Sequence, residues 1–258
     1  MTIKHRLFLS NYLSLALSLL FGFAPHFLSA QSAGVVKLRV SNQFGKEALL
    51  LNQPFTTLHG DTIELTRFVY YLSNIQLIGK NKTVWKQPES YHLLEVSEEG
   101  QSAFDITLDG VPEGEYTEIA FAVGVDSIRN HSGKQVGALD SDNGMFWMWE
   151  TGYVFLKAEG FFYLQSGRKK SVVYHIGRDD CYQPVRLKMG NKPFQVQKTK
   201  ATNLVMIADV RQLFGGFPGA TIELKAPYID ESVSVMGGPK APKVARNYAR
   251  MFSISLQP

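Results

Sequence analysis

The hydrophobic pattern of the chain is that of β-strands. Residues 62–78 form a continuous run rich in apolar and β-branched side chains, which predicts one long bent strand or two consecutive strands. Further strands are expected at 35–40, 91–96, 104–108, 116–125, 153–164, 171–176, 185–189, 194–197, 203–209 and 252–256. Short strands at this spacing predict an all-β protein, an antiparallel β-sandwich of the Greek-key or immunoglobulin-like type with long loops.

Two segments depart from the strand pattern. Residues 241–251 place Val244, Tyr248 and Met251 at helical spacing, with Pro242 in the first turn, so we expect one short C-terminal helix there. Residues 126–143 are polar and contain glycine, which predicts a long loop. Long loops inside a compact domain often carry function.

The first 30 residues have the organisation of a secretory signal peptide. Lys4 and Arg6 precede an apolar stretch that ends in the small-residue sequence Leu-Ser-Ala. We therefore expect cleavage after Ala30 and a single β-sandwich domain over 31–258. The mature protein is expected to be soluble and to be exported, to the periplasm or an equivalent compartment.

Charge and cysteine content restrict the function further. The chain has 27 Lys and Arg against 23 Asp and Glu, and two of the basic residues belong to the leader. The remaining charge is nearly balanced, so no nucleic-acid partner is expected. Cys181 is the single cysteine, which excludes an internal disulfide. Its thiol can be buried, paired with another molecule or used as a metal ligand.

The most unusual stretch is 144–160, where two tryptophans and two methionines occupy five consecutive positions. Read as an extended segment, it puts Met145, Trp147 and Trp149 on one face and Met148 on the other. This composition suits a core strand buried on both sides. It also suits the rim of a soft-metal or redox site, because thioethers and indoles are electron-rich.

Two histidines share a local context on predicted strands. His92 and His175 each follow a tyrosine and precede a large aliphatic residue. Imidazoles bind copper, zinc and nickel, and strands from distant parts of a chain can bring two of them together. The alternative is that each histidine is simply hydrogen-bonded in the core or at its rim. The sequence contains no nucleophile elbow, zincin motif, phosphate-binding loop or dinucleotide fingerprint, so it does not point to an enzyme.

A series of short motifs is spread over most of the chain. They are Phe-Val-Tyr-Tyr-Leu-Ser-Asn-Ile at 68–75, Ser-Tyr-His-Leu at 90–93, Gly-Val-Asp-Ser-Ile-Arg-Asn at 124–130, Gly-Ala-Leu-Asp at 137–140, Gly-Met-Phe-Trp-Met-Trp at 144–149 with Gly-Tyr at 152–153, Leu-Lys-Ala-Glu-Gly at 156–160, Tyr-His-Ile-Gly at 174–177 and Ala-Arg-Asn-Tyr-Ala-Arg-Met-Phe at 245–252. In this order they resemble the methanobactin-partner, or MbnP-like, family of exported copper-binding proteins.

The resemblance implies a β-sandwich that binds copper for storage, delivery or handling. It also implies a di-haem partner of the cytochrome c peroxidase type, and a tryptophan near the metal that is oxidised to kynurenine in some members. By motif position, it makes His92 and His175 the candidate copper ligands, and Trp147 or Trp149 the oxidisable or metal-adjacent indole.

The chain departs from the family pattern after residue 177. Relatives commonly continue with glycine and asparagine, whereas this chain has Arg-Asp-Asp-Cys at 178–181. The departure brings Cys181 close in sequence to His175. A thiolate and an imidazole, with a thioether from Met145 or Met148, would suit Cu(I).

Two other functions compete with copper handling. The chain can be a periplasmic binding or accessory module without metal, in which the aromatic run is core or a ligand platform. A weaker alternative is a metal-dependent enzyme for hydrolysis or oxidation. Sharing a fold does not decide among them.

Overall fold

A computed structural model describes residues 32–148, 151–164, 166–190, 192–215 and 233–257. The predicted signal peptide and Trp149 lie outside the described residues. Two α-helices are found in the described part, α1 (Ser127–Asn130) and α2 (Ala241–Tyr248). Neither is long and apolar enough to cross a membrane. Short 3-10 turns are η1 (Gly137–Leu139), η2 (Ser141–Asn143), η3 (Asp179–Cys181), η4 (Val210–Phe214) and η5 (Gly238–Lys240).

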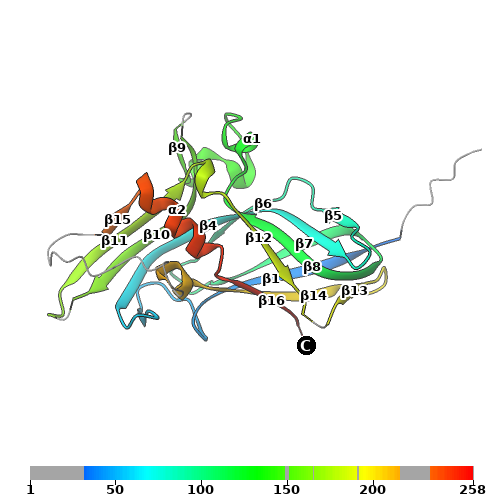
Figure 1. Cartoon of the computed structure of the whole chain (residues 1–258), viewed down its shortest axis with the longest axis horizontal. Coiled ribbons are helices and arrows are strands. Elements are labelled where there is room, and N and C mark those ends of the chain that lie inside the picture. The colour runs from blue at the N-terminus through cyan, green and yellow to red at the C-terminus, as the bar shows by residue number, and fades with distance from the viewer. Residues whose placement is uncertain (1–31, 149–150, 165, 191, 216–232, 258) are drawn as a thin grey trace, which may run out of the picture. The chain divides into compact units, whose positions relative to one another are not determined.

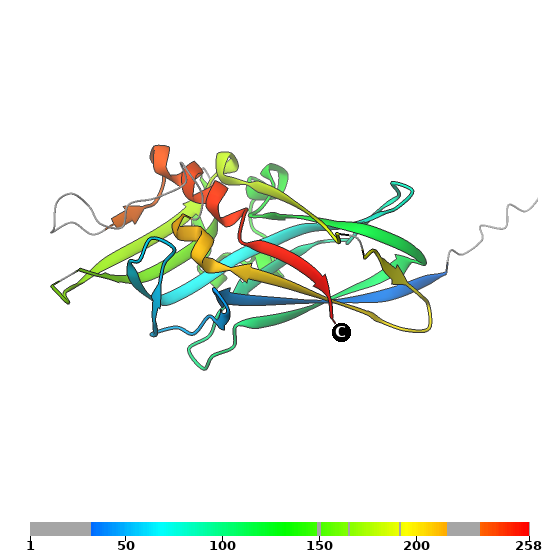
Figure 2. The same cartoon turned by 60° about the horizontal axis from the view of Figure 1, so that its bottom comes forward.

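The described strands form two sheets (Figures 1 and 2). The smaller has the order β16-β14-β1-β2, with β7 also paired to β1. Its strands are β1 (Ala33–Phe44), β2 (Glu47–Ala48), β7 (Ala103–Pro112), β14 (Thr202–Asp209) and β16 (Phe252–Leu256). The larger has the order β12-β8-β4-β10-β11-β15, and shorter strands pair with β4, β8 and β10. Its strands are β3 (Pro54–Thr56), β4 (Thr62–Gly79), β5 (Val84–Lys86), β6 (Tyr91–Glu95), β8 (Gly114–Val123), β9 (Phe146–Met148), β10 (Gly152–Tyr163), β11 (Lys169–Gly177), β12 (Gln183–Lys188), β13 (Phe194–Val196) and β15 (Val233–Val235).

The predicted all-β fold with one short C-terminal helix is confirmed. Most pairings are antiparallel as expected, but β1 with β14 and β11 with β15 run parallel. Both parallel pairs join strands that are far apart in sequence. No short turn links such strands, so local sequence carries no signal for their relative direction.

The long strand β4 is the centre of the larger sheet. Its inner face, with Phe68 and Tyr70, is fully buried against the smaller sheet. The Tyr70 hydroxyl donates a hydrogen bond to Asn42 Oδ1 of β1 at 2.9 Å, and the Tyr70 ring lies 6.2 Å from that of Phe252. These contacts join the two sheets through one tyrosine.

One bent strand, rather than two, spans the predicted run. Asn74 has a φ of 56°, in the left-handed region that a short amide side chain tolerates. The register with β8 shifts between Ser73 and Gln76. The partner of β4 changes from β10 to β8 just before this irregularity, since the pairing with β10 ends at Tyr70 and that with β8 begins at Leu72. A single continuous strand therefore pairs with both.

The outer face of β4 is buried as well. Val69 and Tyr71 alternate with the core residues and are nevertheless fully buried. The excursion 126–145, which holds α1, η1 and η2, covers this face. The Tyr71 hydroxyl donates to Ala138 O at 2.9 Å, and the Tyr71 ring meets that of Tyr153 edge-on at 5.8 Å.

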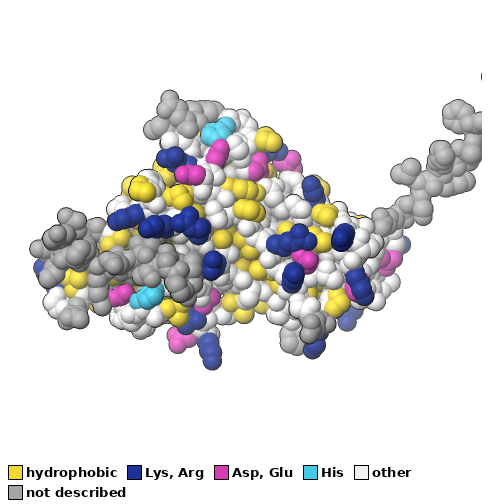
Figure 3. Space-filling model, in the orientation of Figure 1, with side chains coloured by type: hydrophobic (Ala, Val, Ile, Leu, Met, Phe, Trp, Pro, Cys, Tyr) yellow, Lys and Arg dark blue, Asp and Glu magenta, His cyan; other side chains and the backbone are white. Residues whose placement is uncertain are grey.

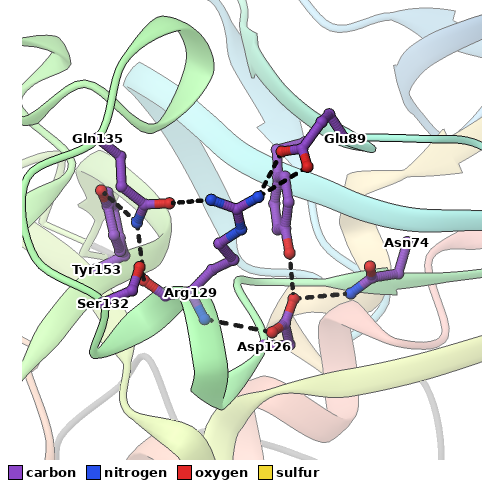
Figure 4. Close-up of polar contacts among 8 residues, drawn as sticks. Asn74, Glu89, Asp126, Arg129, Ser132, Gln135 and Tyr153 are labelled. Atoms are coloured by element: carbon purple, nitrogen blue, oxygen red, sulfur yellow. Dashed lines mark hydrogen bonds and ion pairs between the residues drawn. The ribbon is translucent and has the colours of Figure 1, made fainter.

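A polar network ties the start of this excursion to β4 and β6 (Figure 4). Asp126 accepts hydrogen bonds from Asn74 Nδ2 at 3.1 Å, from the Tyr91 hydroxyl and from the backbone N–H of Arg129 at 3.3 Å. Burial by itself would raise the pKa of Asp126, but these hydrogen bonds outweigh it and lower the pKa. The ionised carboxylate is therefore the form that holds the excursion in place.

Arg129 and Gln135 continue the network from one end of the loop to the other. The Arg129 guanidinium contacts both carboxylate oxygens of Glu89, at 2.8 and 2.6 Å. Gln135 Nε2 donates to Arg129 O at 2.8 Å and to the Tyr153 hydroxyl at 3.2 Å. Tyr153 in turn donates to Leu139 O at 2.5 Å. The family motif at 124–130 thus serves to fasten the loop.

We expect Gly160→Ala to destabilise the fold by about 3 kcal/mol or more, because overpacking against backbone cannot be relieved by a rotamer change. Gly160 lies at a register shift between β10 and β4, and a β-carbon there would be 2.0 Å from Glu64 O. Urea unfolding measures the loss. The control is Gly110→Ala, which has open space and only a left-handed backbone to oppose it, a cost of about 1–2 kcal/mol. Equal losses of unfolding free energy in the two variants would contradict the close approach of the β4 backbone to Gly160.

The Asp126 carboxylate should make stability depend on acid pH. Its pKa is lowered in the folded state, so its contribution is complete above the unfolded pKa and disappears as pH falls through the folded value. We expect the gap in unfolding free energy between the wild type and Asp126→Asn to narrow as pH falls below about 4, the pKa of an unfolded aspartate. Asp109→Asn, at an exposed site, is the control and should show a small gap throughout. A gap for Asp126→Asn that stays constant with pH would refute the role.

Candidate functional site

The tryptophan-rich run is a hairpin and not one extended strand. Gly152 pairs with Met148, so the chain reverses between β9 and β10. Gly144 and Gly152, before and after β9, have φ of 70° and 69°, in the left-handed region that favours glycine. Met145 is fully buried, as the core interpretation expected. The side chain of Met148 and all of Trp149 lie outside the described part.

Trp147 lies against the end of β11. A β-carbon on Gly177 would be 2.9 Å from Trp147 Cζ3 and 2.4 Å from Tyr153 O. The indole therefore covers the backbone at a position where only glycine fits. Trp147 itself is partly buried and packs on the hydrophobic core.

His175 lies two residues before Gly177 on β11, so its side chain points to the face that the indole covers. Its Nε2 is 2.6 Å from Glu159 Oε1. The imidazole is mostly buried, with 16% of its side-chain surface exposed. The hairpin thus places Trp147 and His175 on the same face of the sheet.

Lys157 completes this face. It lies directly opposite His175 in the register of β10 and β11, and its Nζ donates to Gly144 O at 2.6 Å. Burial is the main cause that lowers the pKa of Lys157, and the nearby Arg67 lowers it further, while two carboxylates act in the opposite direction. We call Trp147, Lys157, Glu159 and His175 the outer-face site.

His92 does not join the outer-face site. It pairs with Leu72 of β4, whereas Lys157 pairs with Val69, and Lys157 pairs in turn with His175. Leu72 and Val69 point to opposite faces of β4, so the two histidines lie on opposite faces of the larger sheet. Three strand spacings, about 14 Å, also separate them across the sheet. The structure therefore does not bring them together as two ligands of one ion.

His92 has structural partners instead. Its Nε2 is 2.9 Å from Gln87 Oε1, and Gln87 Nε2 donates to Thr107 O of β7 at 3.5 Å. Burial lowers the pKa of His92, which favours the neutral imidazole. His92 and Gln87 thus link β6 of the larger sheet to β7 of the smaller sheet, in agreement with the interpretation of His92 as a hydrogen-bonded histidine at the rim of the core. An open pocket of ≈ 530 Å³ lies beside it and is also lined by Phe104.

Cys181 lies in the core. Its side chain is fully buried, and its backbone oxygen accepts a hydrogen bond from Tyr248 of α2. Burial raises the pKa of the thiol to about 12, so without metal the protonated form prevails at neutral pH. The Cu(I) pair of Cys181 with His175 stays a prediction.

The segment that departs from the family pattern anchors α1. Arg178 has φ 77° and ψ 154°, a conformation that is almost confined to glycine. Asp179 accepts hydrogen bonds from Ser127 Oγ at 2.7 Å and Asn130 Nδ2 at 2.9 Å, and His131 Nε2 is 3.2 Å from it. Burial would raise the pKa of Asp179, but these partners lower it. The segment 178–181 is therefore held to α1 by hydrogen bonds, and His131 contributes to this connection.

The fit of the outer-face site to copper rests on one imidazole. A histidine whose second nitrogen is held by a carboxylate is a common arrangement in metal sites, because the carboxylate orients the ring and makes it a better donor. His175 with Glu159 meets this description. Within the described ranges there is no cluster of three His, Cys, Asp or Glu side chains placed to hold a metal. Glu159 and Lys157 lie in the motif at 156–160, but their hydrogen-bond partners are not recognisable from the sequence.

Comparison with curated proteins finds no sequence match. Among solved structures, the chain is similar to MbnP from Methylosinus trichosporium, with 17% sequence identity and a TM-score of 0.55. The alignment covers 88% of this chain and 99% of the other, so the folds correspond over nearly their full lengths. The family model described as MbnP matches residues 33–235. The chain therefore belongs to the MbnP family.

Proposed function

We propose that this protein is an exported copper-binding protein used in copper storage, delivery or handling. His175 is the copper ligand, and Trp147 is the indole next to the metal. The single observation that carries the proposal is the outer-face arrangement, in which an imidazole held by Glu159 at 2.6 Å shares a face with that indole. Copper in either oxidation state accepts imidazole nitrogen.

Family membership supports copper as the metal. The chain belongs to the MbnP family, whose name refers to a partner of methanobactin, and the motifs that contain Trp147 and His175 are among those that resemble it. The residues that differ, 178–181, leave the outer-face site itself intact. Copper bound there would supply a Lewis-acidic and redox-active centre, while His175 provides the bond to it and Glu159 the orientation.

Export is part of the same proposal. The leader over 1–30 has the charge and hydropathy of a cleavable signal peptide. On the face shown in Figure 3, basic and acidic side chains lie among apolar and uncharged ones. The absence of a nucleic-acid partner stays a prediction.

A di-haem partner of the peroxidase type would act on the tryptophan beside the metal. Trp147 is the described indole in that position. It is partly buried, so part of its surface stays open to solvent.

Substitution of His175 tests the copper ligand. We expect His175→Ala to weaken copper binding by more than about 100-fold, because loss of a ligand exceeds the 10–100-fold cost of losing a second-shell partner. Isothermal titration against a competing chelator measures it. The matched control is His92→Ala, which removes the bond to Gln87 and lowers stability by about 1 kcal/mol but should leave copper affinity unchanged. The reverse result would assign the site to His92.

Metal content and intact mass test the function as a whole. Protein purified from its own exported compartment should carry copper in near-stoichiometric amount and lack the leader. If the partner acts on it, Trp147 should carry the mass change of one oxygen gained and one carbon lost. A metal-free chain that also refuses added Cu(I) and Cu(II) would instead support a binding module in which the tryptophans are core.

A further inference from the structure

Strand β10 carries Lys157 and Glu159 two residues apart on one face. Glu159 contacts His175, and Lys157 contacts Gly144 at the start of the segment that holds Trp147. We propose that they are positioning residues which assemble this site before metal arrives. Glu159 selects the imidazole nitrogen that His175 offers, and Lys157 holds the segment that presents Trp147. The part of this inference that concerns copper rests on the proposed function, whereas the part that concerns the metal-free protein does not.

The Glu159 contact determines the tautomer of His175. An ionised carboxylate only accepts hydrogen bonds, so a contact of 2.6 Å to Nε2 requires the proton to be on Nε2. In a neutral imidazole the lone pair then belongs to Nδ1. The nitrogen offered to a metal is therefore Nδ1, and Glu159 increases its basicity through the ring.

The neighbouring charges leave Glu159 available for this task. Arg67 lies opposite Glu159 in the register of β4 and β10. Its guanidinium NH2 group is engaged by Glu95 at 3.1 Å. The Arg67–Glu95 pair thus satisfies much of the nearby positive charge, while Glu159 bonds to His175.

The Lys157 contact acts on the indole. Lys157 Nζ donates to Gly144 O at 2.6 Å, and Gly144 has the left-handed φ of 70° at which the chain enters Met145 and then β9. A charged donor makes a stronger hydrogen bond to a carbonyl than a neutral one does, and this one is made at the surface of the protein. It fixes the start of the short segment that ends at Trp147. The same strand therefore positions both the imidazole and the ring next to it.

Such preorganisation matters because a site held to within about half an ångström need not be ordered when the metal binds. His175, which Glu159 positions, lies directly opposite Lys157, so the two positioning residues act at neighbouring points of the sheet. The geometry predicts that they can be removed separately: Glu159 affects the imidazole, and Lys157 affects the indole.

The first test uses metal-free protein with ¹⁵N-labelled histidine. We expect NMR to show His175 as a single Nε2–H tautomer, and Glu159→Ala to convert it to a mixture. Glu159→Gln keeps an accepting oxygen and should restore the Nε2–H form in part. Glu47→Gln, at an exposed site on β2, is the control and should change nothing. A single Nε2–H tautomer in Glu159→Ala would overturn the role of Glu159.

The second test reads the copper-bound site. Pulsed EPR of the Cu(II) protein reports the imidazole nitrogen that is remote from the metal, and Glu159→Ala should alter that signal and weaken affinity about 10–100-fold. An unchanged remote-nitrogen signal would overturn the assignment of Nδ1 as the ligand. If the wild type binds no copper while the tautomer still depends on Glu159, the proposed function fails and the positioning of His175 stands.

The third test addresses Lys157 in a background where Trp85→Phe and Trp149→Phe leave Trp147 as the single indole. We expect Lys157→Met to lower the fluorescence anisotropy of Trp147 and shift its emission to the red. The exposed Lys188→Met is the control. If Trp147 emission and anisotropy stay as in the parent, Lys157 does not hold the indole.

Discussion

Strand β4 is buried on both faces, and the rest of the structure depends on this constraint. Its inner face packs on the smaller sheet through Phe68 and Tyr70. The outer face, with Val69 and Tyr71, would expose a large apolar surface if it were left open. The excursion 126–145 covers it, and every polar group of the network in Figure 4 serves to keep that cover in place. Because the excursion leads directly into β9, covering β4 also delivers Trp147 to its position over β11.

Much of the fold could be predicted because the strand pattern is strong where strands are long. β4, β8, β10 and β14 were all expected from alternation and apolar runs. The strands that were not expected, such as β3 and β15, are only three residues long and carry no periodicity. The parallel pairings were also not predictable, since they join segments with no turn between them.

The candidate site was predicted only in part, and the histidines show why. His92 and His175 look alike in sequence, yet the registers of β6 and β11 put them on opposite faces of the sheet. Register is decided by long-range pairing, which a single sequence does not reveal. The anchors Glu159 and Lys157 were equally hidden, because their partners lie 16 and 13 positions away. Arg178 shows the same limit, since its glycine-like conformation adjoins Asp179, whose partner Asn130 of α1 lies 49 positions away.

The parallel pairing of β1 with β14 has a consequence for biogenesis. β1 begins at Ala33, but its neighbour β14 comes from Thr202–Asp209, and the strand beyond β14 is the C-terminal β16. A polypeptide is synthesised from its amino end, so the smaller sheet lacks part of its strands until nearly the whole chain has been made. Contacts this distant in sequence form slowly. The topology therefore postpones closure of the core to the end of synthesis.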